Sequence, residues 1–264
     1  RYFHQNNLVP NQIKTTYMSI FPKHQRYHLS FNEQQLEHDD ATKLLGVYVQ
    51  NDLKYHQHAT HVIKKLQPHI TTLKYVNKTL SKHALKQIYF SFIYPHLIYS
   101  IPVWGSHEEN KTYLQPLHRT HKKIVRLLHR KPPQTPTKPL MESMKIMNIF
   151  NLYTYRTAIE MHEFIHQTEI KNRPQHTHHY RRAADVHRYP TRFAMQQCLF
   201  IPNTYQYSAN YKPDQATRDN STMFAKKFAK TWNKLPAKLR NIEHLPTFKK
   251  DLCDFLLEKQ ASKL

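Results

Sequence analysis

The residues whose spacing points most directly to chemistry lie in the segment HEFIH, His162 to His166. Two histidines four residues apart share one face of a helix, where they can bind zinc while the intervening glutamate activates water. The chain has 21 histidines, so chance pairs at this spacing are expected, and no third ligand is evident. We therefore interpret the segment as an ordinary amphipathic helix with Ile159, Phe164 and Ile165 near its buried side, and keep a zinc metalloprotease as a remote alternative.

Paired carboxylates would suit phosphoryl transfer, because divalent cations held between them neutralise charge on the attacking and leaving oxygens. The adjacent acids Asp39 and Asp40 follow Glu37 and His38, and we interpret this group as a polar turn between strands. The histidine cluster HTHHY at 176–180 lies in a basic segment, where solvated or phosphate-facing side chains are expected. The sequence thus predicts neither a catalytic carboxylate pair nor a metal site.

The balance of charge points to a polyanionic partner. The 264 residues include 40 Lys and Arg against 18 Asp and Glu, a formal net charge of +22. A charge of this size creates a field that attracts polyanions, and nucleic acid is the leading candidate.

Cysteine usage and hydropathy indicate the compartment. Cys198 and Cys253 match no metal or redox spacing, which favours packing roles in a reducing environment. The longest apolar stretch, IYFSFIYPHLIYSIPVW, is interrupted by prolines and is shorter than the roughly 20 residues of a spanning helix. No secretory leader follows Arg1. We expect an intracellular protein of the nucleus or cytoplasm, not secreted and with no membrane partner, and a chain whose amino-terminal part is missing.

The elements that must position these residues change type near Tyr55. Strand patterns occur in TTYMSIF, YHLSF and KLLGVYV, within residues 15–49, and predict a small antiparallel sheet. Apolar residues then recur at helical spacing. We predict an α+β fold that is mostly α, with a sheet region, thumb-like helices, a helical extension, a basic loop and C-terminal helices at 1–54, 55–130, 131–170, 171–215 and 216–264.

Basic side chains are placed off the apolar stripes of the predicted helices. The helix around 114–131 keeps leucine and isoleucine on one stripe and leaves most of its lysines and arginines outside it. The 171–192 loop adds further basic residues together with Tyr180 and Tyr189, which could stack on bases, whereas Trp232 is expected in the core.

Gly46, one of only two glycines, occurs within the apolar, β-branched run KLLGVYV. A glycine inside a strand has no side chain to pack and usually marks a bulge or a close approach of another backbone. We therefore predict that Gly46 lies at such an approach site.

Two blocks carry a family resemblance: NNLVPNQIKTTYM, residues 6–18, and the later KLLGVYVQNDLKYHQH. They resemble the last two sequence blocks of reverse transcriptases of non-LTR, LINE-like retrotransposons, written N-x-L-x-x-N-x-x-K-T and K-x-L-G-V-x-I-D. The first block is matched by Asn7, Leu8, Asn11, Lys14 and Thr15, and the second by Lys43, Leu45, Gly46, Val47 and, displaced by about one residue, Asp52.

The resemblance continues downstream and covers about residues 6–258. LSKHALKQIYFSFIYPHLIYSIPVWG resembles the thumb pattern of the family and includes the second glycine, Gly105. HRYPTR, TWNKLPAKLR and TFKKDL resemble its C-terminal signatures. Each motif is weak alone, and their order and spacing carry the match.

The resemblance implies the end of a polymerase palm with a primer-grip strand at KLLGV, followed by a thumb and a helical tail. The parent enzyme would be an RNA-directed DNA polymerase using Mg²⁺. The Y-x-D-D turn that supplies its carboxylates is not present in this chain, so we expect no bound metal and no activity from the chain alone. The expected partners are an RNA template and a DNA primer, held mainly through phosphates, and the missing N-terminal palm and fingers.

The predicted nucleic-acid contacts combine the resemblance with the placement of charge; they are Lys14, Lys43, Gly46, Lys65, Arg119, Lys122, Lys123, Arg126, Arg130 and Arg192. Lys14 is also a candidate general acid toward the pyrophosphate leaving group. The alternative from another class is a non-catalytic nucleic-acid-binding protein derived from a decayed or reused retroelement.

Overall fold

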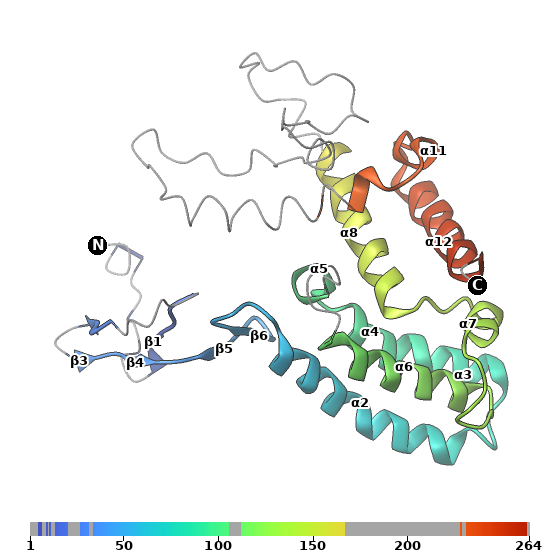
Figure 1. Cartoon of the computed structure of the whole chain (residues 1–264), viewed down its shortest axis with the longest axis horizontal. Coiled ribbons are helices and arrows are strands. Elements are labelled where there is room, and N and C mark those ends of the chain that lie inside the picture. Colours follow the sequence, from blue (N-terminus) through green and yellow to red (C-terminus); the bar gives the residue numbers. More distant parts are fainter. Residues whose placement is uncertain are drawn as a thin grey trace.

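The computed structural model describes residues 5–6, 9, 11, 14–20, 27–31, 34–105, 112–166, 228 and 231–262. Within these ranges helices predominate and strands are short, which confirms the predicted α+β, mostly α fold. Figure 1 shows the strands toward one end of the molecule and the helices gathered at the other. The predicted 171–215 loop, with Cys198, Arg192, Tyr180, Tyr189 and the 176–180 histidines, lies outside the described residues.

The strands form three pairs, each of two strands, instead of the single antiparallel sheet that the sequence predicted. β1 (Thr16–Tyr17) pairs in parallel with β4 (Glu37–His38). β2 (Ser30–Phe31) and β3 (Gln34–Gln35) pair antiparallel, as do β5 (Ala41–Leu44) and β6 (Val47–Gln50). The run KLLGVYV is therefore a hairpin rather than one strand, because Leu45 and Gly46 form the turn between β5 and β6.

The first long helix, α2 (His56–Val76), buries one stripe against the helical core. Its buried apolar side chains recur every three or four residues, which places them on one face. They are Ala59, Val62, Leu66, Ile70 and Leu73. Figure 1 shows α2 lying alongside α6 (Leu114–Leu128), whose own buried stripe includes Leu117 and Ile124.

A widened turn precedes Pro95 in the next helical stretch. α3 (Lys82–Ile88) leads into a π-helical turn, η2 (Tyr89–Ile93), and then into α4 (Tyr94–Ile98). Proline lacks a backbone donor and its ring collides with the carbonyl four residues earlier, so a regular α-turn is unfavourable here. The π-turn lets the chain continue, because the Tyr94 N–H donates to the carbonyl of Tyr89.

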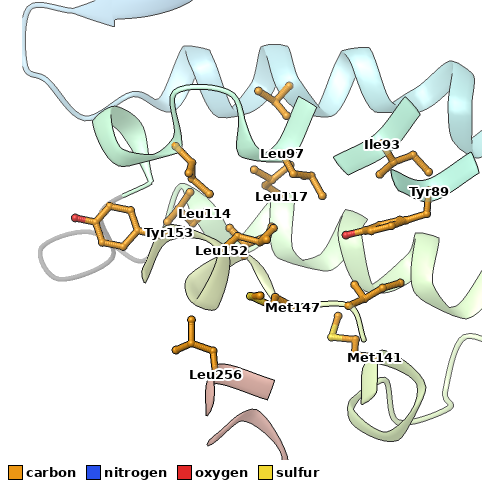
Figure 2. Packing of buried hydrophobic residues seen from close by; sticks show 14 of the residues in the cluster. Tyr89, Ile93, Leu97, Leu114, Leu117, Met141, Met147, Leu152, Tyr153 and Leu256 are labelled. Atoms are coloured by element: carbon orange, nitrogen blue, oxygen red, sulfur yellow. The ribbon is translucent and has the colours of Figure 1, made fainter. Parts of the chain in front are cut away.

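The remaining helices complete the core. α5 (Ile101–Trp104) and α7 (Lys138–Met144) are short, α8 (Ile149–His166) and α12 (Leu245–Ser262) are long, and α11 (Ala237–Arg240) precedes α12. Figure 2 shows Leu97 of α4 facing Leu117 of α6, with Met147 and Leu256 approaching from the α8 and α12 side. One continuous cluster of buried side chains thus joins α2 to α12.

Polar side chains align α8 with α12. Gln260 Oε1 accepts from the backbone N–H of Asn148 at 2.9 Å, and Asn151 Nδ2 donates to the carbonyl of Leu256 at 2.9 Å. Gln260 Nε2 also donates to the carbonyl of Ile146 at 3.3 Å. Since buried polar groups are costly when unsatisfied, these bonds favour one register of the two helices over its neighbours.

Candidate nucleic-acid interface

Gly46 lies in the turn between β5 and β6. This placement corrects the prediction that it marks an approach site inside a strand. Leu45 has φ 45° and Gly46 has φ 83°, and two positive φ values in a two-residue loop are typical of a type I′ hairpin. The Tyr99 hydroxyl donates to the Leu45 carbonyl at 2.6 Å. A Cβ added at Gly46 would meet the Tyr99 ring at an ordinary 3.4 Å, so conformation rather than space explains the glycine.

The close approach occurs at the other glycine. A Cβ on Gly105 would lie 2.6 Å from the carbonyl oxygen of Ile101 and 3.2 Å from the Tyr153 ring. The Gly105 N–H donates to that same carbonyl at 2.7 Å. A side chain is thus excluded where α5 ends, and the turn can pack tightly against α8.

The hairpin, α2 and α4 together carry a set of basic and aromatic side chains that we call the cationic face. The backbone N–H of Tyr48 donates to His58 Nδ1 at 3.3 Å and links the hairpin to α2. The members of the cationic face are Lys43 and Tyr48 of the hairpin, His61, Lys64, Lys65 and His69 of α2, Phe92 of η2, and His96 of α4.

Ring contacts join members of the face in two groups. Lys43 Nζ lies 5.7 Å from the centre of the Tyr48 ring, which packs edge-on against His61 at 5.0 Å. Farther along α2, His69 lies 6.1 Å from the ring of Phe92 and 5.5 Å from that of His96. Ring contacts thus join the hairpin to the first half of α2, and the second half of α2 to η2 and α4.

The pKa values of two histidines on this face are lowered, in part by neighbouring positive charges. Burial lowers the pKa of His61, and the charges of Lys65, Lys43 and Lys64 lower it further. The pKa of His96 is lowered first by burial and then by His69, Lys65 and His61. Because the neighbouring charges that act on these imidazoles are all cationic, an anion placed on the face would meet favourable potential from several side chains.

Exposed apolar side chains border the cations. Phe92 is 56% exposed, Tyr99 is 51% exposed, and Leu45 at the tip of the hairpin is 83% exposed. Aromatic faces beside lysines match the needs of a nucleic-acid strand, since bases stack on rings while lysines contact phosphates. The α2 signal for this face was present in the sequence as His61, Lys65 and His69, spaced four residues apart beside the apolar stripe.

The basic residues predicted on α6 divide between solvent and structural roles. Arg119 and Lys123 are exposed. Arg126 Nε donates to the carbonyl of Thr135 at 2.8 Å. The Arg130 guanidinium donates to two carbonyls of the α2–α3 connection, those of Asn77 and of Leu80, the latter at 2.6 Å. Arg126 and Arg130 therefore use part of their hydrogen-bond donors to bind backbone carbonyls within the chain.

The amino-terminal candidates lie among the short strands. Lys14 is exposed, and its backbone N–H donates to Asn11 Oδ1 at 3.2 Å. Asp40 Oδ1 accepts from Asn51 Nδ2 at 2.9 Å, which supports the polar-turn interpretation of this acidic pair. Figure 1 shows β1 and β4 away from the helices. The general-acid role suggested for Lys14 stays a prediction.

His162, the first residue of the HEFIH segment, lies in the helical core, and the side chains of residues 164–166 lie outside the described part of the chain. His162 is buried, stacks on Phe248 with ring centres 4.3 Å apart, and donates from Nε2 to the carbonyl of Ile242 at 2.6 Å. Glu163 pairs with Lys249 at 3.6 Å. Trp232 is fully buried beside Phe248, as predicted. These contacts favour core packing over zinc binding by His162.

The part of the chain that the structure describes contains no group of three or more histidine, cysteine or acidic residues able to hold a metal ion. Among the same residues, no helix is both long and apolar enough to cross a bilayer. Comparison of the chain with protein-family profiles, with curated proteins and with solved structures found no match in any of the three.

Proposed function

We propose that this chain holds an RNA template and a DNA primer, through their phosphates, as the end of the palm and the thumb of a reverse transcriptase of a non-LTR retrotransposon. The observation that carries the proposal is the convergence of Lys43, His61, Lys65 and His96 from three elements onto one face bordered by exposed rings. The order of the family-like blocks around Gly46 and Gly105 supports the same function.

The physical role of the face is to position a duplex, not to read its sequence. Lysines contact phosphates whatever the base, and flexible ammonium groups tolerate small changes of register. The hairpin turn at Leu45 and Gly46 directly follows β5, the strand that carries Lys43. Mg²⁺ would be held by carboxylates of the parent polymerase, and the described residues of this chain do not form such a cluster, so no catalytic step is assigned to it.

The test is binding of an RNA–DNA hybrid by the full chain as a function of salt. About four phosphate contacts predict a loss of roughly 100-fold in affinity between 50 and 200 mM salt. The variant Lys64→Glu/Lys65→Glu should weaken binding at least tenfold at low salt and reduce the salt slope by about 2.

The matched control is Lys238→Glu/Lys250→Glu, which changes the net charge equally at exposed positions of α11 and α12. The control should retain most of the affinity, because its lysines lie outside the cationic face. Equal losses in the two variants would show that binding follows net charge alone and would overturn the assignment of the face.

A non-catalytic nucleic-acid-binding protein, derived from a decayed or reused retroelement, is the second candidate. It needs no Y-x-D-D turn, and the given sequence contains none. The two candidates share the face and the binding test, and differ in what precedes Arg1. An in-frame Y-x-D-D turn upstream in the genomic sequence supports the polymerase, whereas stop codons there support the second candidate.

A further inference from the structure

A second cationic site uses none of the residues of the cationic face. A pocket of about 780 Å³ is bounded by α6, α7, the start of α8, α12 and the residues just before α11. This volume lies within the range of small-molecule sites. Four lysines from four separate segments line it, and we call it the four-lysine pocket: Lys122, Lys138, Lys234 and Lys259.

Lysines supply the charged side chains of the four-lysine pocket. No aspartate or glutamate is among its described lining residues. Ammonium groups around one hollow present positive potential to an anion that enters it. Lysines gathered around a concave surface therefore suit an anionic ligand.

Aromatic and polar groups complement the lysines. Phe150 and Phe255 line the pocket, and Lys259 Nζ lies 5.6 Å from the Phe255 ring centre. His118 also lines it, packs 5.2 Å from the Phe150 ring, and has a buried Nδ1 with no hydrogen-bond partner within the described chain. A ligand with both a planar ring and charged oxygens would use all three features.

The walls are held in place before any ligand arrives. Asn151 Nδ2 donates to Gln260 Oε1 at 3.2 Å, and Lys138 Nζ donates to the carbonyl of Ala261 at 3.0 Å. These bonds fix α7 and α8 against the end of α12. A preformed pocket loses less conformational entropy on binding than one that must be ordered.

We propose that the four-lysine pocket binds a nucleoside phosphate, with the phosphate among the lysines and the base against Phe150 or Phe255. The ligand can be a free nucleotide or one unpaired unit of a nucleic-acid strand, since both present the same chemistry. The proposal rests on residues outside the cationic face and does not depend on the function proposed above.

The test uses the full chain and calorimetric titration with AMP, adenosine and inorganic phosphate. We expect AMP to bind at least tenfold more tightly than either adenosine or phosphate. The variant Lys122→Gln/Lys259→Gln should weaken AMP binding at least tenfold, because charge-assisted hydrogen bonds are lost, whereas Lys238→Gln/Lys250→Gln should leave it unchanged. AMP binding no tighter than adenosine binding, or equal in the two variants, would overturn the proposal.

A second variant tests the base. Phe255→Leu keeps an apolar side chain but removes the ring, and it should weaken AMP while leaving phosphate binding unchanged. An unchanged AMP affinity in both Phe255→Leu and Phe150→Leu would remove the nucleoside from the proposal. Circular dichroism and thermal melting of each variant verify that the fold is retained.

A third arm separates the two sources of the ligand. A single-stranded hexathymidylate that competes with AMP, and loses affinity in Lys122→Gln/Lys259→Gln, indicates a unit of a strand. A hexamer that binds alongside AMP indicates a free nucleotide. The variant Lys64→Glu/Lys65→Glu should retain AMP binding, so failure of the cationic face and failure of the pocket are distinguishable.

Discussion

The cationic face and the four-lysine pocket are both basic, yet the chain builds them in opposite ways. The face uses elements that follow one another, from Lys43 to His96, on an open surface. The pocket draws its lysines from α6, α7, the residues before α11 and α12, up to 137 positions apart between Lys122 and Lys259. An open surface built from consecutive elements suits a polymer, whereas a concave site built from distant segments suits a small ligand or a single unit of a strand.

The comparison teaches that the two regions depend on different parts of the fold. The face needs α2, α4 and the hairpin, which lie within one stretch of the chain from Lys43 to His96. The pocket needs the pairing of α8 with α12, which brings Asn148 and Gln260 together. Damage to the α8–α12 pair should therefore abolish the pocket and leave the face, unless the helices unfold as one cooperative unit.

The largest expected effect comes from Phe248→Ala. Phe248 is fully buried and packs against His162 and Trp232, so its truncation should cost about 3–5 kcal/mol of unfolding free energy. Urea unfolding measures the cost, and hydrogen exchange should show α12 opening before α2. The exposed Phe92→Ala is the control and should cost under about 0.5 kcal/mol. Simultaneous loss of protection in α2 and α12 would mean that the two regions share one unit.

Acid should destabilise the regions together, because each contains a histidine that is neutral in the folded chain. Burial lowers the pKa of His58, beside the face, to about 4, with His61 and Lys65 adding to the effect. Burial, followed by the charge of Lys122, lowers the pKa of His118 to about 4.

The deepest of these histidines lies between the two regions. His121 is fully buried on α6 and lies 2.9 Å from the Tyr89 hydroxyl, and burial lowers its pKa to about 3. The unfolded chain binds protons near pH 6.5 and the folded chain does not, so stability is full above pH 6.5 and falls as the pH drops toward 4. We expect roughly 3 kcal/mol to be lost by pH 4.5, mainly at His121, because solvent screens the other two.

Urea unfolding at pH 7.0, 5.5 and 4.5 measures this loss. The variant His118→Asn should lose less stability over the same interval, since one of the three protonation sites is gone. A stability that is constant or rises on acidification would contradict the placement of these imidazoles in the core.

Gly105→Ala should affect both regions, and Gly46→Ala only one. At Gly105 the new Cβ would collide with the Ile101 carbonyl, where overpacking costs about 1–3 kcal/mol. At Gly46 the space is adequate and the strain of a positive φ costs about 1 kcal/mol, confined to the hairpin. Thermal melting compares the two. An equal or larger loss for Gly46→Ala would reverse the assignment of the close approach.

The buried stripes of the helices followed from the sequence, whereas the β5–β6 hairpin did not. Helical spacing predicted the buried stripes of α2 and α6, because a periodic pattern is a local property. The segment KLLGVYV is compatible with one strand and also with a hairpin that has Leu45 in its turn. Because leucine is unfavourable at positive φ, its presence gave no sign of the turn. The hairpin is stabilised by Tyr99, whose hydroxyl donates to the Leu45 carbonyl from 54 residues away, and no local pattern contains that contact.

The same reasoning separates the two basic regions. Lys65 on α2 was predicted as a nucleic-acid contact, whereas His61 and His69, each four residues away from it, were not. Lys122 was predicted as one of a basic row on α6, yet the structure places it in a pocket with Lys259. The pairing of α8 with α12 creates that neighbourhood, and such long-range packing is not encoded in the spacing of either helix.

The smallest predicted effect concerns the cationic face, where binding should be coupled to protonation of His61 and His96. The low pKa values of His61 and His96 come from burial and neighbouring cations, and bound phosphates would oppose the second cause. Binding of an RNA–DNA hybrid should therefore take up protons, and affinity should rise about two- to fivefold from pH 7.5 to 6.0. Phosphodiesters do not titrate in this interval, so the change reports on the protein. His61→Gln/His96→Gln should remove most of the pH dependence while the salt slope persists, and a wild-type affinity that is constant across the interval would place the duplex elsewhere.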